Sequence, residues 1–137
     1  MPIWSRGFPR TMGAAGEARG FIRQVLSSRI PPQVLDDVVL MTSELAINGA
    51  RHVPDDKGDW LEVLVDHGDE VLRVSVRDPG TDFDTNDIAR AQEAGGWGLR
   101  LVSGLSSRWG VAPSSDGTDV WFELDRPSDG QGDWPAL

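Results

Sequence analysis

The sequence contains no cysteine among its 137 residues. This absence excludes disulfide frameworks, thiolate metal sites and cysteine nucleophiles. Long apolar runs are also missing, because no stretch approaches the roughly 20 apolar residues that a membrane-spanning helix needs. The first ten residues lack the apolar segment of a secretory signal peptide. We therefore expect a cytoplasmic protein with no membrane association.

Basic residues are in the minority, with 13 lysines and arginines against 22 acidic residues and a formal net charge of −9. Such a chain repels phosphate backbones at long range, so a nucleic acid is not an expected partner. A small polyphosphate ligand remains permitted, because backbone dipoles and a metal ion can outweigh the net charge locally.

The length suits one domain with its own apolar core, and we assign this domain to residues 1–125. The remaining segment, residues 126–137, is rich in proline, glycine and aspartate. This composition is typical of a flexible acidic tail.

Apolar residues at helical spacing predict two long helices early in the chain. The first covers residues 13–28, and the second begins at Pro31 and Pro32, which suit a helix start, and continues to about His52. The buried face of the second helix is predicted from apolar residues that recur in steps of four, three and four: Val34, Val38, Met41 and Leu45. Two shorter helices are expected over residues 85–94 and 99–107.

Runs of alternating or β-branched residues predict the strands. They cover residues 3–8, 60–66, 71–78, 107–112 and 120–124. Turn residues at 67–70 and 114–117 join the last four strands into two hairpins. Helices followed by hairpins predict an α+β fold, namely a two-layer α/β sandwich in which helices cover one face of an antiparallel or mixed sheet.

Three polar residues of the second helix, Glu44, Asn48 and His52, are spaced four residues apart. This spacing is close to one helical turn, so their side chains project from the same side. The carboxylate of Glu44 suits a general base, and the neutral amide oxygen of Asn48 suits a Mg²⁺ ion that already has phosphate ligands. The alternative is an ordinary solvated face of an amphipathic helix, which is the commoner situation for polar residues.

A second polar feature, Asp78-Pro79-Gly80, ends an otherwise apolar strand. A buried carboxylate at this point needs a hydrogen-bond donor, and the exocyclic amine of adenine would supply one. Gly80 would let the backbone approach a flat base closely. The alternative is a simple Pro-Gly turn in which aspartate favours the first position.

The third feature is the glycine-rich segment Gly95-Gly96-Trp97-Gly98-Leu99, which opens a predicted helix. Free N–H groups at the positive end of a helix form a cradle for phosphate groups. A glycine cluster alone is a weak signal, and a plain flexible loop is the alternative.

Together, the order and spacing of these features resemble the GHKL ATPases, which include sensor histidine kinases and the ATPase subunit of DNA gyrase. The sequence is most similar to the small bacterial anti-sigma-factor serine kinases and their actinobacterial relatives. Residues 44–52 resemble the N box of that group, and residues 78–80 and 96–102 resemble its first and second glycine boxes. Residues 117–124 resemble its last glycine turn and closing strand, so the resemblance covers roughly residues 8–125.

The resemblance implies a role for each matching residue. Glu44 would be the catalytic base, and Asn48 would coordinate the Mg²⁺ that bridges the triphosphate of ATP. Asp78 would bind the adenine amino group, with Gly80 beneath the ring, and residues 81–95 would be the ATP lid. The other nucleotide contacts would come from Arg51, His52, Gly96, Gly98, Leu99 and Thr118.

Three positions depart from the pattern of that group. Gly49 stands where alanine is usual, and Trp97 stands where arginine is frequent and would add a cation near the phosphates. After Gly117 the group usually has lysine and then threonine, whereas this chain has Thr118 and then Asp119. The threonine that assists adenine binding has therefore either moved by one position or been lost.

The resemblance implies an ATP-dependent regulatory protein, acting as an anti-sigma factor and as a serine kinase that phosphorylates an anti-sigma-factor antagonist. A sigma factor and this antagonist would be its partners, and a homodimer would be its assembly. The departures favour an alternative, a non-catalytic module that regulates transcription by protein binding only. A third possibility is an interaction protein that binds no nucleotide.

Overall fold

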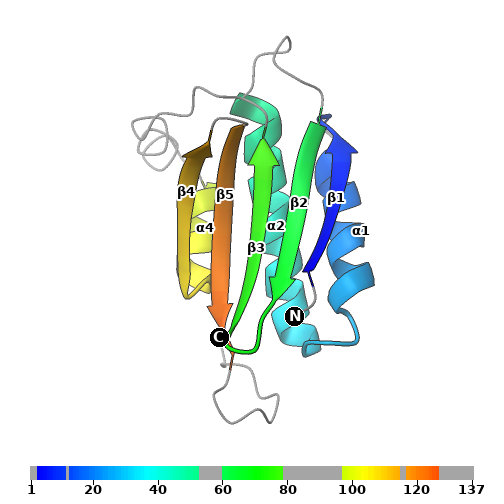
Figure 1. Ribbon diagram of the computed structural model, residues 1–137, viewed down its shortest axis with the longest axis vertical. Helices are drawn as coiled ribbons and strands as arrows, with labels where there is room; N and C mark the ends of the chain where they lie inside the picture. The colour runs from blue at the N-terminus through cyan, green and yellow to red at the C-terminus, as the bar shows by residue number, and fades with distance from the viewer. Residues whose placement is uncertain (1–2, 12, 53–59, 79–96, 115–116, 127–137) are drawn as a thin grey trace.

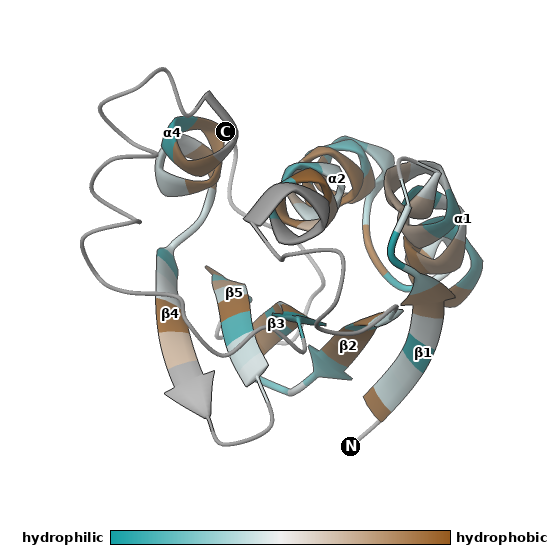
Figure 2. Cartoon of the chain, turned by 90° about the horizontal axis from the view of Figure 1, so that it is seen from above, coloured by the Kyte–Doolittle hydropathy of each residue, from teal (hydrophilic) through white to brown (hydrophobic). Residues whose placement is uncertain are grey.

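The computed structural model describes residues 3–11, 13–52, 60–78, 97–114 and 117–126. In these ranges five strands form one antiparallel sheet in the order β1-β2-β3-β5-β4, and helices cover one of its faces (Figures 1 and 2). The elements are, in chain order, β1 (Ile3–Pro9), α1 (Ala14–Leu26), α2 (Pro32–His52), β2 (Trp60–His67), β3 (Val71–Asp78), α4 (Trp97–Leu105), β4 (Arg108–Ser114) and β5 (Gly117–Asp125). The predicted α+β sandwich is confirmed.

The core lies between the helices and the sheet. Alternate residues of β2 and β3 point into it, because successive side chains of a strand face opposite sides. The predicted buried face of α2 is confirmed, since Val38, Met41 and Leu45 are fully buried. Each such side chain contributes about 1.5–3 kcal/mol relative to an exposed position. This packing fixes the rotation of α2 about its own axis.

Several element boundaries differ from the sequence-based expectation, most clearly at α4, β4 and β5. Helix α4 begins at Trp97, two residues before the predicted start, so Gly98 lies in its first turn and not in a preceding loop. Strands β4 and β5 extend to Ser114 and back to Gly117, which are paired with each other. Their hydrogen-bonded ladder therefore continues through residues that we expected to form the turn. The predicted helix 85–94 lies outside the described residues.

Gly117 occupies the tight end of this hairpin with a φ of 147°. Side chains rarely tolerate this conformation, and glycine adopts it freely because it has no Cβ atom. The positive φ explains how β5 can pair with β4 from its very first residue.

Ion pairs connect the strands on the sheet face that the helices leave open. Arg77 bonds Asp119 through Nε at 2.8 Å and Nη2 at 3.2 Å, and it also reaches Glu62 at 3.4 Å. Arg108 bonds both Glu123 and Asp125. Each exposed pair adds little stability by itself, but opposite charges on neighbouring strands favour one register over others.

Arg126, the first residue of the predicted tail, is hydrogen-bonded to the β2–β3 hairpin. Its N–H donates to the Glu70 carbonyl at 2.8 Å, and its Nη1 donates to the Gly68 carbonyl at 2.7 Å. Residues 127–137 lie outside the described residues. Within the described ranges, none of the helices combines the length and apolar character needed to cross a membrane.

Candidate functional site

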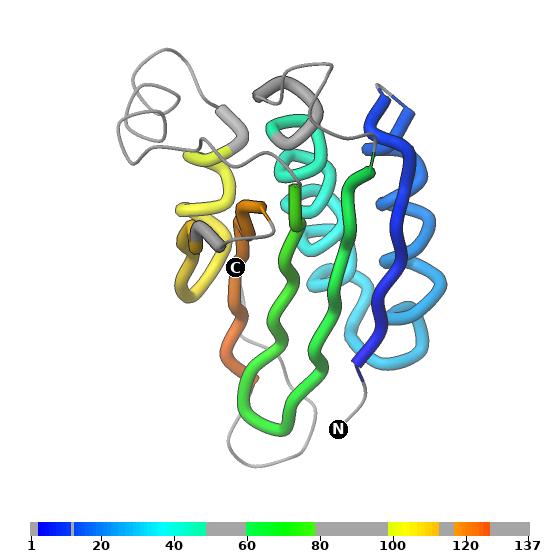
Figure 3. The backbone as a smooth tube through the Cα atoms, turned by 45° about the horizontal axis from the view of Figure 1, so that its top comes forward, coloured from blue at the N-terminus to red at the C-terminus, as the bar shows by residue number. Residues whose placement is uncertain are grey.

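One end of the sandwich gathers the segments that carry the sequence features. The last turns of α2, the end of β3, the start of β5 and the start of α4 lie at this end (Figure 3). Helix α2 contacts both β3 and α4. Segments separated by up to about 70 residues in the chain thus meet at one place, as expected for a ligand site.

Asp78 and Thr118 form the centre of this end. They are directly opposite each other on β3 and β5, and their exposed fractions are only 5% and 1%. Cross-strand partners have Cβ atoms about 4.5–5.5 Å apart. Asp78 shares its sheet face with the buried Val76, so both polar side chains lie on the helix side of the sheet. Thr118 therefore lies beside Asp78, and Asp119 is the cross-strand partner of Arg77.

A carboxylate and a hydroxyl together accept and donate hydrogen bonds, which suits recognition of an aromatic base that carries an amine. Burial strengthens this recognition, because water competes poorly for the hydrogen bonds. The donor set at this end of the sheet therefore fits the adenine of ATP. Asp78 is buried and ends a paired strand, whereas Pro79 and Gly80 of the alternative turn lie outside the described residues.

Glu44 and Asn48 lie one turn apart on α2, and both are half-buried. Thr42 and Ser43, just before them, are buried, and Arg19 of α1 donates a 2.8 Å hydrogen bond from Nη1 to the Ser43 hydroxyl. This bond ties α2 to α1 next to Glu44. Glu44 and Asn48 thus lie at the boundary of the core, partly accessible to solvent.

The remaining predicted contacts are placed only in part. α2 extends to His52 as predicted, but the side chains of Arg51 and His52 lie outside what the structure describes, as do Gly80, Gly96 and the predicted lid at 81–95. Leu99 is buried in the core from the first turn of α4. Only its backbone N–H is therefore available to a phosphate group.

Sequence reasoning did not single out Arg77, which adjoins Asp78. Its two hydrogen bonds to Asp119 join the residues next to Asp78 and Thr118 on the opposite face of the sheet. They favour the register that places Thr118 across from Asp78. The available signal was the pair of arginines on β3, Arg73 and Arg77, against acidic residues at the same alternation on β5.

The described residues offer few protein ligands for a metal at this site. Among the described residues, no three histidine or acidic side chains are grouped to hold a metal ion. Asn48 offers an amide oxygen, a ligand that Mg²⁺ accepts when phosphate oxygens and water complete its shell. This chemistry fits a metal that arrives with a nucleotide.

These features define a class of protein. It is an α+β sandwich in which one end of the sheet holds a buried acidic residue, polar side chains of a helix and the N-terminus of another helix. A family model described as the histidine kinase-like ATPase domain matches residues 8–124. The match spans most of the chain, and the chain belongs to this family. Membership implies ATP binding, for which Mg²⁺ is the usual companion. A comparison with curated proteins finds no match.

Proposed function

We propose that the chain is an ATP-binding regulatory protein that acts in the cytoplasm as an anti-sigma factor and serine kinase. Its substrate is a serine of an antagonist protein, and its other partner is a sigma factor. The observation that carries the proposal is the buried Asp78–Thr118 pair at the same end as Glu44 and Asn48, in a chain of this family. The net charge of −9 favours regulation through proteins over direct contact with DNA.

In this proposal Asp78 accepts a hydrogen bond from the adenine amine, and Thr118 supports the same edge of the base. Asn48 holds the metal through its amide oxygen. Mg-ATP, when bound, supplies the phosphoryl group and neutralises part of its charge. The N–H groups at the start of α4 face the phosphates, as the positive end of a helix favours anions.

Glu44 acts on the incoming serine. Its carboxylate accepts the hydroxyl proton as the serine oxygen bonds to the γ-phosphorus and the bond from that phosphorus to the bridging oxygen breaks. The products are phosphoserine and ADP. Phosphoryl transfer needs mainly positioning and charge stabilisation, which a fixed carboxylate one turn from Asn48 provides.

The kinase proposal is tested by incubating the protein with labelled ATP and a candidate antagonist. Label should appear on a serine of the antagonist, and Glu44→Ala should lower the rate by about 10²-fold or more, since a positioned base contributes about 10²–10⁴-fold. ATP affinity should change little, because Glu44 contacts the hydroxyl and not the nucleotide. An antagonist that binds but is never labelled would contradict the kinase role.

That outcome would favour the alternative, a non-catalytic member that regulates only by binding proteins. Trp97 supports this alternative, because it replaces a frequent arginine at the start of α4. Asp119 no longer supports it, since its carboxylate pairs with Arg77 on the open face of the sheet while Thr118 lies next to Asp78. This alternative predicts that the Glu44→Ala variant binds ATP as the parent does, and that neither protein transfers a phosphoryl group.

A further inference from the structure

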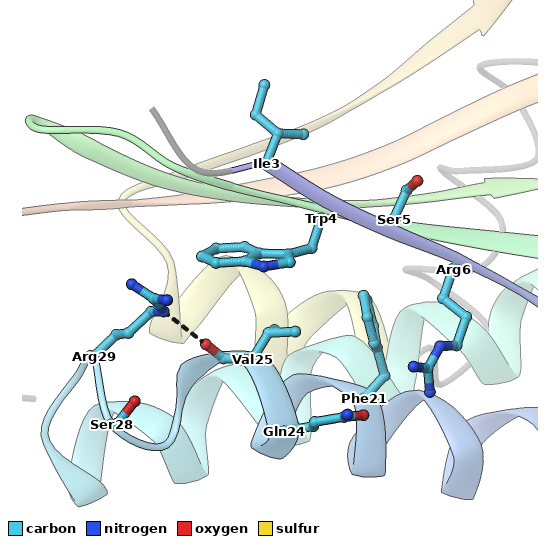
Figure 4. Close-up of a pocket in the computed structure, with 9 residues that line it drawn as sticks. All are labelled: Ile3, Trp4, Ser5, Arg6, Phe21, Gln24, Val25, Ser28 and Arg29. Carbon is cyan, nitrogen blue, oxygen red and sulfur yellow. Dashed lines mark hydrogen bonds between the residues drawn. The ribbon is translucent and has the colours of Figure 1, made fainter.

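An open groove of about 540 Å³ lies between β1 and α1 (Figure 4). β1 is an edge strand, since it is the first strand in the sheet order and pairs with β2. Ile3 pairs with Asp66 at the end of β2 that is far from Trp60, whereas Asp78 and Thr118 lie toward the other end of the sheet. The groove is therefore separate from the proposed nucleotide site.

Two arginines flank an aromatic floor in this groove (Figure 4). The guanidinium of Arg29 stacks on Trp4, with 4.8 Å between its carbon and the ring centroid, and its Nε donates to the Val25 carbonyl at 3.1 Å. The guanidinium carbon of Arg6 lies 5.0 Å from the ring centroid of Phe21. Stacking holds each guanidinium in place and leaves most of its N–H groups available.

Neither arginine of the groove has a carboxylate partner among the described residues. Arg73, Arg77 and Arg108 of the sheet, by contrast, are each paired with an acidic side chain. The groove therefore combines positioned but uncompensated cations with the rings of Trp4 and Phe21.

The segment that lines the groove carries a charge opposite in sign to that of the whole molecule. The first 31 residues carry five arginines and one glutamate, whereas the complete chain has a formal net charge of −9. Arg29 also acts beyond the groove, since it adds to the lowering of the His67 pKa that burial causes first and Arg126 second, against the opposite effect of Asp66 and Asp69. An anionic partner is thus attracted to this face and repelled by the rest of the surface.

We propose that this groove binds an acidic, extended segment of a partner protein, which adds to β1 as a further strand. Among the described residues no strand pairs with the outer edge of β1, and strand addition would satisfy the backbone groups of that edge. Side chains of an added strand return to the same face at every second residue, so alternating acidic residues reach Arg6 and Arg29. A second copy of the chain is disfavoured, because it would bring four arginines into one interface.

The test uses a fluorescently labelled peptide of alternating glutamate and valine, as long as β1, and measures its anisotropy against the full chain without nucleotide. The peptide should bind, and binding should weaken as salt increases. Arg6→Gln together with Arg29→Gln should reduce affinity by about tenfold or more, as expected for lost charge-assisted hydrogen bonds. Arg100→Gln, a control that removes an exposed charge from α4, should leave affinity within about twofold.

Hydrogen exchange provides the second measurement, since strand addition should slow exchange at alternate amides of β1. The role of the groove arginines would be overturned if a glutamine–valine peptide bound equally well. It would also be overturned if Arg100→Gln lowered the affinity for the peptide as much as the double variant does. Binding without protection of β1 amides would overturn strand addition. Peptide binding that requires removal of residues 127–137 would assign the groove to the chain's own acidic segment. Protection of β1 amides that depends only on protein concentration would assign it to a second copy of the chain. None of these outcomes depends on ATP binding.

Discussion

Asp78 contributes a buried carboxylate at the end of β3, with Thr118 across from it. A buried charge is costly unless hydrogen bonds compensate it, so its surroundings select ligands that donate. An amide at this position can present an N–H group toward a donor, and two donors cannot form a hydrogen bond with each other. The identity of this single side chain should therefore decide the preference for adenine.

Asp78→Asn should weaken Mg-ATP binding by about 1–3 kcal/mol, the scale expected when a buried group loses its partner. Calorimetric titration of parent and variant measures the difference. Denaturant unfolding without nucleotide is the control, since a variant that has merely lost its fold shows a lowered midpoint there. Equal affinities would show that Asp78 does not contact the base.

His67, the last residue of β2, has a pKa below its ordinary value of 6.5, because of burial first and then of Arg126 and Arg29. The unfolded chain therefore takes up the proton more readily than the folded one. The free energy of unfolding should be unaffected above the ordinary pKa and should fall as pH drops from there toward the lowered value.

His67→Gln should remove this part of the pH dependence. Urea unfolding of parent and variant at about pH 7.5 and about pH 5.5 measures it, and the stability lost between the two values should be smaller in the variant. Equal losses would mean that the His67 proton is not linked to folding. The histidine lies in the strand because the ladder with β3 continues to Leu72, its partner.

At the scale of elements, the close approach of β4 to Trp121 limits what the sheet tolerates. A Cβ atom added to Gly110 would lie 2.7 Å from Cζ2 of Trp121, whose ring is stacked by Arg73 at 4.3 Å. The ring would have to move and to lose this stacking. Glycine is thus required at this position of β4 by its neighbour on β5.

Gly110→Ala should destabilise the protein by about 1–3 kcal/mol, the usual cost of overpacking. The matched control is Gly20→Ala in α1, where an added Cβ meets nothing within 4 Å. That change should instead stabilise by up to about 1 kcal/mol, since alanine is the better helix former. Melting curves of the two variants measure the contrast, and a Gly110→Ala variant as stable as the parent would show that Trp121 moves without cost.

The elements themselves were largely predictable from the sequence. The apolar spacing of α2 and the alternation in β2 and β3 report directly on which side chains are buried, and these elements match their predictions closely. The start of α4 and the short β4–β5 turn were not predictable in the same way. Both involve glycine and serine residues, whose local preferences favour a break that the surrounding packing and ladder override.

The residue types of the candidate site could be predicted from the sequence, but their placement relative to one another could not. The proposed chemistry rests on the residue types at Glu44, Asn48 and Asp78, which the sequence gives directly. The position of Thr118 beside Asp78 depends on the β3–β5 register, which cross-strand contacts such as Arg77–Asp119 favour. The groove between β1 and α1 could not be inferred at all, because it arises only when Trp4 and Arg29 meet in the folded chain.

Over the whole molecule, the two polar regions lie apart along the sandwich and differ in chemistry. The first is the end that holds Asp78 and Asn48, where nucleotide binding is proposed, and the second is the groove of Arg6 and Arg29. In Figure 1 the end of β3 points to the top of the molecule, and the start of β1 lies below. This separation would let the proposed protein partner and the nucleotide bind together, and each of the two proposals can be tested without the other.

The most direct measurement is a calorimetric titration of the full chain with Mg-ATP. Binding of one nucleotide per chain is the predicted result, together with a rise in melting temperature, since a ligand present at about 100 times its Kd stabilises the folded state by about 2.7 kcal/mol. Omitting Mg²⁺ should weaken binding, because Asn48 then has no metal to hold. The absence of both heat and thermal shift at about millimolar Mg-ATP would contradict nucleotide binding by this chain.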